Sequence, residues 1–252
     1  MHPRFTSQVV LITGGGSGIG RAAAVAFARE GATVAVAGRR PEPLHETVRL
    51  IAAEGGVASA ITADVSSAAD VARMVASTVQ RHGGLHVAFN NAGILEAGPL
   101  AGMDEAAWER QLAVNLTGVF LAMKHEITHM RSGGGGVIIN TASNLGAHLR
   151  LPFLGAYAAS KAAVSALTRA AAREYMADGI RINAISPGPI ETAMSLRPGE
   201  TAADREERLR TALPAGRAGT VAEAAAAVLW LASPEAAFTV GHDLVMDGGA
   251  AA

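Results

Sequence analysis

Short apolar runs alternate with stretches rich in helix-forming residues along almost the whole chain. Residues 9–12 (VVLI) are continuously apolar and lead into a glycine cluster, which predicts a strand buried on both faces of a parallel sheet. Residues 19–30 then carry strong helix formers, and Gly31 is suited to end a helix. The same alternation predicts further strands at 33–37, 57–62, 85–89, 137–140, 180–185 and 244–246, and further helices at 42–54, 68–82, 104–130, 155–177 and 220–232.

The order of these elements predicts the fold class. About seven strands separated by helices indicate an α/β protein with a doubly wound parallel sheet of Rossmann type, whose helices flank both faces. No linker is long enough to divide the chain, so we expect residues 1–252 to form a single domain. Residues 192–217 form the most polar and least patterned stretch.

Composition narrows the range of functions. Half of the residues are hydrophobic but only 4% are aromatic, so Ala, Val, Leu and Ile build most of the core. The 21 basic and 22 acidic residues are mixed along the chain, which argues against a nucleic-acid partner. The absence of cysteine excludes disulfides, thiolate metal sites and cysteine nucleophiles, and we expect no metal. No run reaches the roughly 18 apolar residues of a membrane span, so we expect a cytoplasmic protein with no membrane partner.

A glycine-rich turn lies between the first strand and the first helix. Residues 13–20 read TGGGSGIG, and glycines at such a turn let the backbone approach a pyrophosphate at the positive end of the helix. The alternative is an ordinary glycine-rich turn, but its position after a buried strand at the start of the chain favours nucleotide binding. The residues expected to meet the cofactor here are Gly14, Ser17, Gly18, Ile19 and Gly20.

Polar residues follow the next strands at their carboxyl ends, where open α/β sheets bind ligands. Arg39 and Arg40 follow the second strand, where arginine accommodates a 2′-phosphate; this favours NADP over NAD, although two arginines can also cap a solvated loop. Asp64 and Val65 follow the third strand and residues 90–93 (NNAG) follow the fourth. Taken alone, each of these last two segments is better explained as an ordinary turn.

Tyr157 and Lys161 are four residues apart in an Ala-rich helix and project from the same face. A cation beside a phenol favours the phenolate, so we expect a lowered Tyr157 pKa and proton exchange with a substrate oxygen. An isolated pair of this kind is better explained as a tyrosine beside a solvated lysine. Ser143, however, lies just past a buried strand, where its hydroxyl can bond a carbonyl oxygen. Asn115 interrupts an apolar helical stretch and either serves the site or bonds a neighbouring helix.

Taken together, these motifs resemble those of the short-chain dehydrogenase/reductases over essentially the whole chain. The residues that carry the resemblance are TGGGSGIG, the Asp64-Val65 step, NNAG, Asn115, Ser143, YAASK at 157–161 and SPGPIET at 186–192. The resemblance implies that Tyr157 is the general acid or base and that Lys161 holds the nicotinamide ribose. It implies that Ser143 polarises the carbonyl and that Asn115 holds a proton-relaying water. Further cofactor contacts that it implies are Asp64, Val65, Asn91, Ala92, Gly93, Pro187, Gly188, Ile190 and Thr192.

The resemblance also implies a substrate class and an assembly. It predicts hydride transfer between NADP(H) and a ketone or secondary alcohol, as in carbonyl reductases, alcohol dehydrogenases or 3-oxoacyl reductases, under a mobile lid at 192–217. An apolar or alicyclic ketone is expected, although His148 and Arg150 could steer an acidic group. The resemblance also implies a homotetramer, whose subunit interfaces would be formed by helices 104–130 and 155–177 and by the last strand. The expected apolar pocket wall includes Leu95, Leu145, Leu149, Leu151, Phe153, Leu154, Ile190 and Met194.

The sequence leaves three alternatives to an NADP-dependent oxidoreductase. Ser17 stands where many NADP-preferring relatives carry a basic residue, which leaves an NAD-preferring dehydrogenase of the same family open. Sugar-nucleotide epimerases share the tyrosine–lysine pair but usually have a differently spaced glycine motif and an extra substrate domain. A non-catalytic nucleotide-binding protein would tolerate loss of Ser143, Tyr157 or Lys161, all of which are present.

Overall fold

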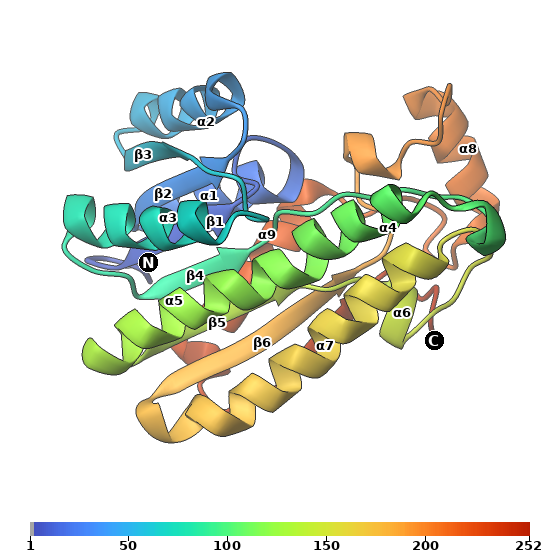
Figure 1. Cartoon of the computed structure of the whole chain (residues 1–252). Coiled ribbons are helices and arrows are strands. Elements are labelled where there is room, and N and C mark those ends of the chain that lie inside the picture. The colour runs from blue at the N-terminus through green and yellow to red at the C-terminus, as the bar shows by residue number, and fades with distance from the viewer. Residues whose placement is uncertain (1–2) are drawn as a thin grey trace.

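The computed structural model describes residues 3–252, which form one seven-stranded sheet with helices on both faces (Figure 1). All neighbouring strands are parallel, in the order β3-β2-β1-β4-β5-β6-β7. The strands are β1 Val9–Thr13, β2 Thr33–Gly38, β3 Val57–Thr62, β4 Val87–Asn90, β5 Gly136–Thr141, β6 Ile180–Pro187 and β7 Asp243–Met246. The predicted fold class is therefore confirmed.

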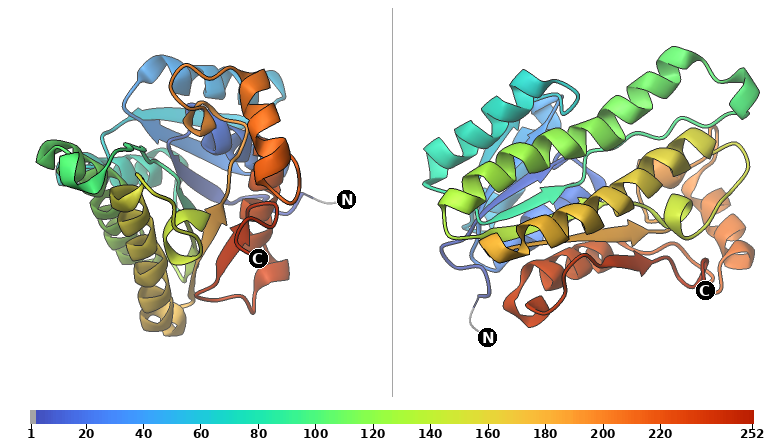
Figure 2. Two further views of the ribbon diagram at one scale, coloured as in Figure 1. Left: turned by 90° about the vertical axis from the view of Figure 1, so that its right-hand side faces the viewer. Right: turned by 60° about the horizontal axis from the view of Figure 1, so that its bottom comes forward.

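Nine α-helices connect and cover these strands within the described part of the chain. They are α1 Gly18–Arg29, α2 Pro41–Ala53, α3 Ala68–His82, α4 Glu105–Leu112, α5 Gly118–Ser132, α6 Asn144–Ala147, α7 Gly155–Tyr175, α8 Ala202–Ala212 and α9 Val221–Ala232. Figure 1 and the turned views of Figure 2 show α3, α5 and α7 across one face, with α1 and α9 on the other. Two buried apolar clusters fill the layers between the sheet and these two sets of helices.

The strand order reverses beside β1, which pairs with β2 on one side and β4 on the other. Crossovers to the two sides leave opposite faces, and this opens a crevice at the carboxyl ends of β1 and β4. The segments that follow these two strands are the glycine turn and residues 90–93. The topology thus places both predicted nucleotide-binding motifs at one point of the sheet edge.

Several element boundaries differ from the sequence prediction. The single helix expected at 104–130 is divided by a π-helical turn, Ala113–Thr117, between α4 and α5. The fourth strand was expected at 85–89 but begins at Val87 and ends at Asn90. The polar stretch 192–217 contains α8, which a reciprocal cap between Thr201 and Asp204 begins.

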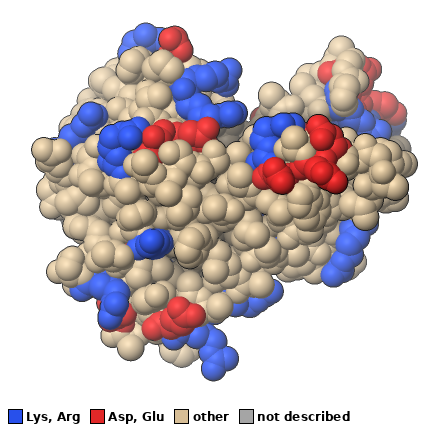
Figure 3. All heavy atoms as spheres, viewed as in Figure 1, with Lys and Arg blue, Asp and Glu red and all other residues tan. Residues whose placement is uncertain are grey.

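No helix within residues 3–252 combines the length and the apolar character that crossing a membrane requires. On the face drawn in Figure 3, basic and acidic side chains are interspersed. Ion pairs between exposed side chains of the described residues include Arg29 with Glu54 and Arg110 with Glu96.

Candidate active site

The glycine turn needs glycine for reasons that the structure makes explicit. Gly14 and Gly18 have φ values of 67° and 52°, in the left-handed region that favours glycine. A Cβ atom on Gly20 would lie 2.4 Å from the Gly14 carbonyl oxygen, because α1 begins directly against the turn. Ser17 occupies the N-cap of α1 but makes no capping hydrogen bond through its side chain. The first N–H groups of α1 are therefore available to an anion.

Two residues that sequence reasoning missed hold this turn from behind. Thr47 donates to the Gly15 carbonyl at 2.8 Å, and Arg21 donates to the Gly16 carbonyl and, at 3.1 Å, to Thr47. The turn's carbonyl oxygens are thus bonded on the protein side. The Gly15 N–H donates to the Ala37 carbonyl at 3.2 Å, so the N–H groups at the start of α1 are the ones left to face a ligand. Neither Thr47 nor Arg21 belongs to a recognisable motif.

A cavity of about 200 Å³ opens beside this turn. It brings together most of the predicted adenosine-side residues from β1, β2, β3 and β4: Gly14, Ser17, Arg39, Arg40, Asp64, Val65, Ala92 and Gly93. Gly16 of the glycine motif and Gly38, which precedes Arg39, also line it. Further lining residues that the sequence did not single out are Pro43, Leu44, Ala63, Ile94 and Val114. Glycine-lined walls, a helix N-terminus and two exposed arginines fit the adenosine and phosphate portion of a dinucleotide.

Other predicted cofactor residues lie around this cavity rather than in its lining. Asn91 packs against Gly14 and Gly20, and its side-chain amide donates to the Thr13 carbonyl at 3.2 Å. The methyl group of Thr192 lies 3.1 Å from the position of a Cβ on Gly18. The segment that follows β6 therefore reaches the glycine turn at Thr192. Pro187, the last residue of β6, and Gly188 and Ile190 precede Thr192 in the chain.

The chemical end of the site is a buried cluster between β5 and α7. Tyr157 and Lys161 are 7% and 3% exposed, and Ser143 is also buried. The Lys161 ammonium nitrogen lies 5.9 Å from the Tyr157 ring centroid and donates to the Thr141 carbonyl at 2.7 Å. Ser143 caps α6 by accepting from the Leu145 N–H at 3.1 Å. The three side chains that the sequence selected are thus gathered from two elements.

The electrostatics of this cluster correct one expectation. The sequence predicted a lowered Tyr157 pKa beside Lys161, but burial of the phenol raises its pKa, and the hydrogen bond with Ser143 only opposes this change. Burial also lowers the pKa of Lys161 to about 8. Both shifts have the same cause, since removal from water disfavours phenolate and ammonium alike. Sequence spacing reveals the neighbouring cation but not the loss of solvent.

Asn115 lies in the π-helical turn between α4 and α5 and is fully buried. Its amide accepts from the Ile94 N–H at 2.8 Å and donates to the Ile94 carbonyl at 2.9 Å and to Ser160 of α7 at 3.2 Å. A Cβ on Gly93 would lie 3.3 Å from the side-chain oxygen Oδ1 of Asn115 and 3.5 Å from Nζ of Lys161. Asn115 therefore joins the segment after β4 to the helix that carries Tyr157.

The predicted substrate wall is divided by the structure into inner and outer residues. The inner residues are partly buried: Leu95, Leu145, Leu149 and Leu154. Phe153 is 63% exposed, and Leu151 and Met194 are also exposed; we call these three the outer residues. The Phe153 carbonyl accepts from the Gly98 N–H at 2.8 Å, which links the segment after β4 to the segment before α7.

Of the two charged residues near this wall, His148 is already engaged. Its Nε2 lies 3.0 Å from Asp243 of β7, whose carboxylate also accepts from Ser165 at 2.6 Å. Arg150 is exposed. The geometry therefore assigns His148 to holding the segment after α6, and only Arg150 is left at the surface.

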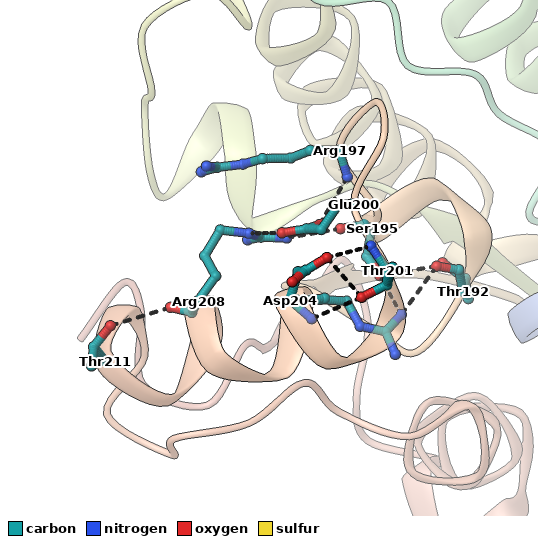
Figure 4. Close-up of polar contacts among 9 residues, drawn as sticks. Thr192, Ser195, Arg197, Glu200, Thr201, Asp204, Arg208 and Thr211 are labelled. Carbon is teal, nitrogen blue, oxygen red and sulfur yellow. Dashed lines mark hydrogen bonds and ion pairs between the residues drawn. The ribbon is translucent and has the colours of Figure 1, made fainter.

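Hydrogen bonds and an ion pair hold together the segment predicted as a lid, residues 192–217 (Figure 4). Arg208 of α8 forms a two-pronged ion pair with Glu200 at 2.6 and 2.8 Å and bonds the Ser195 carbonyl at 3.1 Å. The Arg208 hydrogen bonds lower the pKa of Glu200 to about 2. At its base, Glu191 N–H donates to the Gly219 carbonyl at 2.8 Å, so the two ends of the segment are joined.

Known proteins resemble this chain over nearly its whole length. A family model described as enoyl-(acyl carrier protein) reductase matches residues 14–251. The chain is 41% identical to 2,5-dichloro-2,5-cyclohexadiene-1,4-diol dehydrogenase of Sphingobium indicum, over 97% of each chain. It is 39% identical to cyclohexanol dehydrogenase of an Acinetobacter species, over 98% of this chain and 96% of the other. The crystal structure of levodione reductase matches with a TM-score of 0.92 and 38% identity, over 97% of this chain and 98% of that one.

Fold, site and comparisons together define an NAD(P)-dependent oxidoreductase. The chain belongs to the short-chain dehydrogenase/reductase family. The resemblance found in the sequence is therefore confirmed.

Proposed function

We propose that the protein transfers hydride between NADP(H) and an apolar ketone or the corresponding secondary alcohol. The observation that carries this proposal is the convergence of Ser143, Tyr157 and Lys161 in one buried cluster beside Gly93. The nicotinamide cofactor supplies the hydride. The chain supplies binding groups, a proton donor and exclusion of water.

Each residue of the buried cluster has a proposed role in moving the proton or binding the cofactor. Tyr157 gives its hydroxyl proton to the carbonyl oxygen in reduction and takes a proton from the alcohol in oxidation. Ser143 donates to the same oxygen, and Lys161 holds the nicotinamide ribose while its charge favours the phenolate once Tyr157 has lost its proton. Asn115 holds a water that restores the proton through Lys161. Because burial raises the Tyr157 pKa, the resting residue is the acid, which is the form that reduction requires.

The cofactor would lie along the sheet edge from the glycine turn to Tyr157. Its pyrophosphate would rest on the α1 N-terminus, with Asp64 and Val65 at the adenine and Asn91 at the ribose. Ile190 and Thr192 would meet the carboxamide. The 2′-phosphate would lie on Arg39 and Arg40, which are exposed at the mouth of the adenosine cavity.

The proposed substrate is an apolar or alicyclic carbonyl compound. The inner leucines and the outer residues are apolar side chains, which suit an apolar substrate. Relatives named for cyclohexanol and for a chlorinated cyclohexadienediol support the alicyclic class. The two ends of the lid are joined by a hydrogen bond, and ion pairs link residues within it. Both features favour movement of the lid as a unit, and its closure would exclude water from the site.

A homotetramer is proposed on apolar residues that the single chain leaves exposed. Trp108 of α4 and Phe120 of α5 lie on the helices that the family resemblance assigns to one interface. Trp230 of α9 is exposed, and so is Phe238, which precedes β7. Exposed aromatic side chains of this kind are enriched in protein interfaces.

Cofactor preference provides a direct test. Initial rates of reduction are measured on a panel of alicyclic and linear ketones with NADPH and NADH in parallel. We expect wild type to prefer NADPH, and Arg39→Ala to raise the KM for NADPH about tenfold, because a charged contact to the 2′-phosphate is lost, with little change for NADH. Arg81→Ala, which removes an exposed arginine at the far end of α3, is the matched control and should change neither KM. A wild-type preference for NADH would reject the NADP assignment, and cofactor binding without turnover of any ketone would indicate a non-catalytic protein.

A further inference from the structure

A buried carboxyl group lies behind the nucleotide cavity and has no place in the proposed chemistry. Glu126 of α5 is 0% exposed, and so is Asn140 of β5. Asn90, the last residue of β4, is also buried and donates through its amide to Glu126 Oε2 at 2.9 Å and to Asn140 Oδ1 at 3.1 Å. No basic side chain in residues 3–252 forms an ion pair with Glu126.

The hydrogen-bonding groups of this cluster do not balance if Glu126 is ionised. Both amide hydrogens of Asn90 are used, yet Asn90 Oδ1 and Glu126 Oε1 are buried without a partner. Two acceptors would then face no donor, and one of them would carry an uncompensated charge away from water. A single proton on Oε1 removes both defects, because it turns one orphan acceptor into the donor that the other lacks.

The partners of Asn140 support this orientation of the Asn90 amide. The Asn140 side-chain NH₂ donates to Thr168 of α7 at 2.9 Å and to the Met123 sulfur at 3.1 Å. A thioether can accept a hydrogen bond but cannot donate one, so the Asn140 oxygen is the atom that faces Asn90. Asn90 must therefore present its own NH₂ to Asn140 and to Glu126 Oε2. Burial acts in the same direction, since it raises the pKa of Glu126 to about 7 against the opposing hydrogen bond from Asn90.

Asn90 leads directly into the segment that lines the cofactor cavity. Thr13 of β1 accepts from the N–H groups of Asn91 at 2.9 Å and Ala92 at 3.1 Å, which fixes this segment from the β1 side. On the other side the only side-chain bonds of Asn90 in the described structure are those to Glu126 and Asn140. Removal of the acid would leave the Asn90 side chain with only its bond to Asn140 on this side.

We propose that Glu126 is a neutral carboxylic acid that donates from Oε1 to Asn90 Oδ1, and that this acid–amide pair positions residues 90–93 for the dinucleotide. The positioning part rests on the proposed function, whereas the protonation state does not. Glu126 acts through Asn90 and touches neither substrate nor cofactor, so it is a positioning residue.

Three variants separate this role from general packing. Glu126→Gln keeps one donor and one acceptor in the same places and should reproduce the neutral pair. Glu126→Leu removes both while keeping a similar volume. Ile127→Ala is the control, because it opens the core at the adjacent position of α5 and removes no hydrogen-bonding group.

The test combines infrared spectroscopy with cofactor binding. At about pH 6, below the raised pKa, wild type should show the carbonyl band of a protonated carboxyl that is missing in Glu126→Gln. The Kd for NADPH should stay within about twofold in Glu126→Gln and rise about tenfold in Glu126→Leu. Ile127→Ala should lower Tm and leave the Kd unchanged.

The outcomes are distinguishable. Absence of the infrared band from wild type would overturn the neutral acid whether or not cofactor binds. Equal damage by Gln and Leu, or an unchanged Kd in Glu126→Leu, would overturn the positioning role. A wild-type protein that shows the band but binds no dinucleotide would count against the proposed function and with it the positioning role, while leaving the protonated pair in place.

Discussion

Tyr157→Phe should lower kcat/KM for ketone reduction by about a hundred- to ten-thousandfold, the usual contribution of a positioned general acid. The substitution removes only a hydroxyl from a ring that is almost fully buried, so the packing of α7 is preserved. The bond from Lys161 to the Thr141 carbonyl does not involve the phenol and should persist. We therefore expect folding, Tm and the Kd for NADPH to stay close to wild type while turnover is lost.

The chain offers a matched control, since its other tyrosine lies in the same helix. Tyr175 is the last residue of α7, far from Ser143, and Tyr175→Phe removes the same atom with no expected effect on rate. Full activity in Tyr157→Phe would show that another group supplies the proton. Loss of NADPH binding together with turnover would instead assign Tyr157 a structural role.

Regular elements could be predicted because their signals are local. The apolar run of β1 and the helix formers of α1 lie next to each other in the sequence, and each strand–helix unit repeats that pattern. The π-helical turn could not be predicted, because residues 113–117 lie inside a longer stretch, 104–130, with a helical pattern. Its widening accompanies contacts that Asn115 makes with Ile94 and Ser160, which are distant in sequence.

Helix α8 is a different case, because a local signal was present. Thr201 and Asp204 have the spacing of a capping box, and the structure shows both of its hydrogen bonds. The helix is polar on nearly every side, so it lacks the apolar periodicity that indicates a helix in the sequence. Its ion pair between Glu200 and Arg208 depends on the folded loop.

The candidate site shows the same division between local and long-range information. Motif residues such as Gly14 and Tyr157 could be recognised because each occupies a fixed place relative to a strand or helix. Arg21 and Thr47, which hold the glycine turn, carry no such mark. The Tyr157 pKa was predicted in the wrong direction because desolvation depends on everything packed around the phenol.

Strand β6 shows how a correct element can conceal the role of its side chains. The alternation in residues 180–185 indicates a strand, and the structure confirms one, but its polar positions are engaged by the protein. Asn183 donates to the Thr239 carbonyl at 2.8 Å and accepts from the His242 N–H at 2.9 Å. Arg181, two residues earlier, reaches the C-terminal end of α9.

Arg181→Met should lower the free energy of unfolding by about 3 kcal/mol and Tm by about 6–12 °C. The guanidinium donates to the carbonyls of Leu231, Ala232 and Ser233 at 2.9, 3.3 and 3.1 Å, and to Ala236 at 3.1 Å. Leu231, Ala232 and Ser233 lie at the end of α9, where carbonyls lack partners within the helix and a cation interacts favourably with the helix dipole, and Ala236 lies in the turn that follows. Burial lowers the Arg181 pKa from its usual value, yet the group stays charged.

The measurement is chemical denaturation of wild type, Arg181→Met, Arg181→Lys and Arg49→Met at one protein concentration. Methionine keeps the apolar stem, so the loss reports the hydrogen bonds; lysine keeps the charge without the fork and should recover only part of the stability. Arg49 makes an exposed ion pair with Glu46, and its removal should lower the free energy of unfolding far less than removal of Arg181 does. Equal costs at Arg49 and Arg181 would mean that water satisfies the α9 carbonyls as well as the guanidinium does. The end of α9 that Arg181 holds belongs to a helix that packs against α1, and the glycine turn leads into α1. A large loss of unfolding free energy in Arg181→Met would therefore mean that the layer supporting the glycine turn depends on these hydrogen bonds.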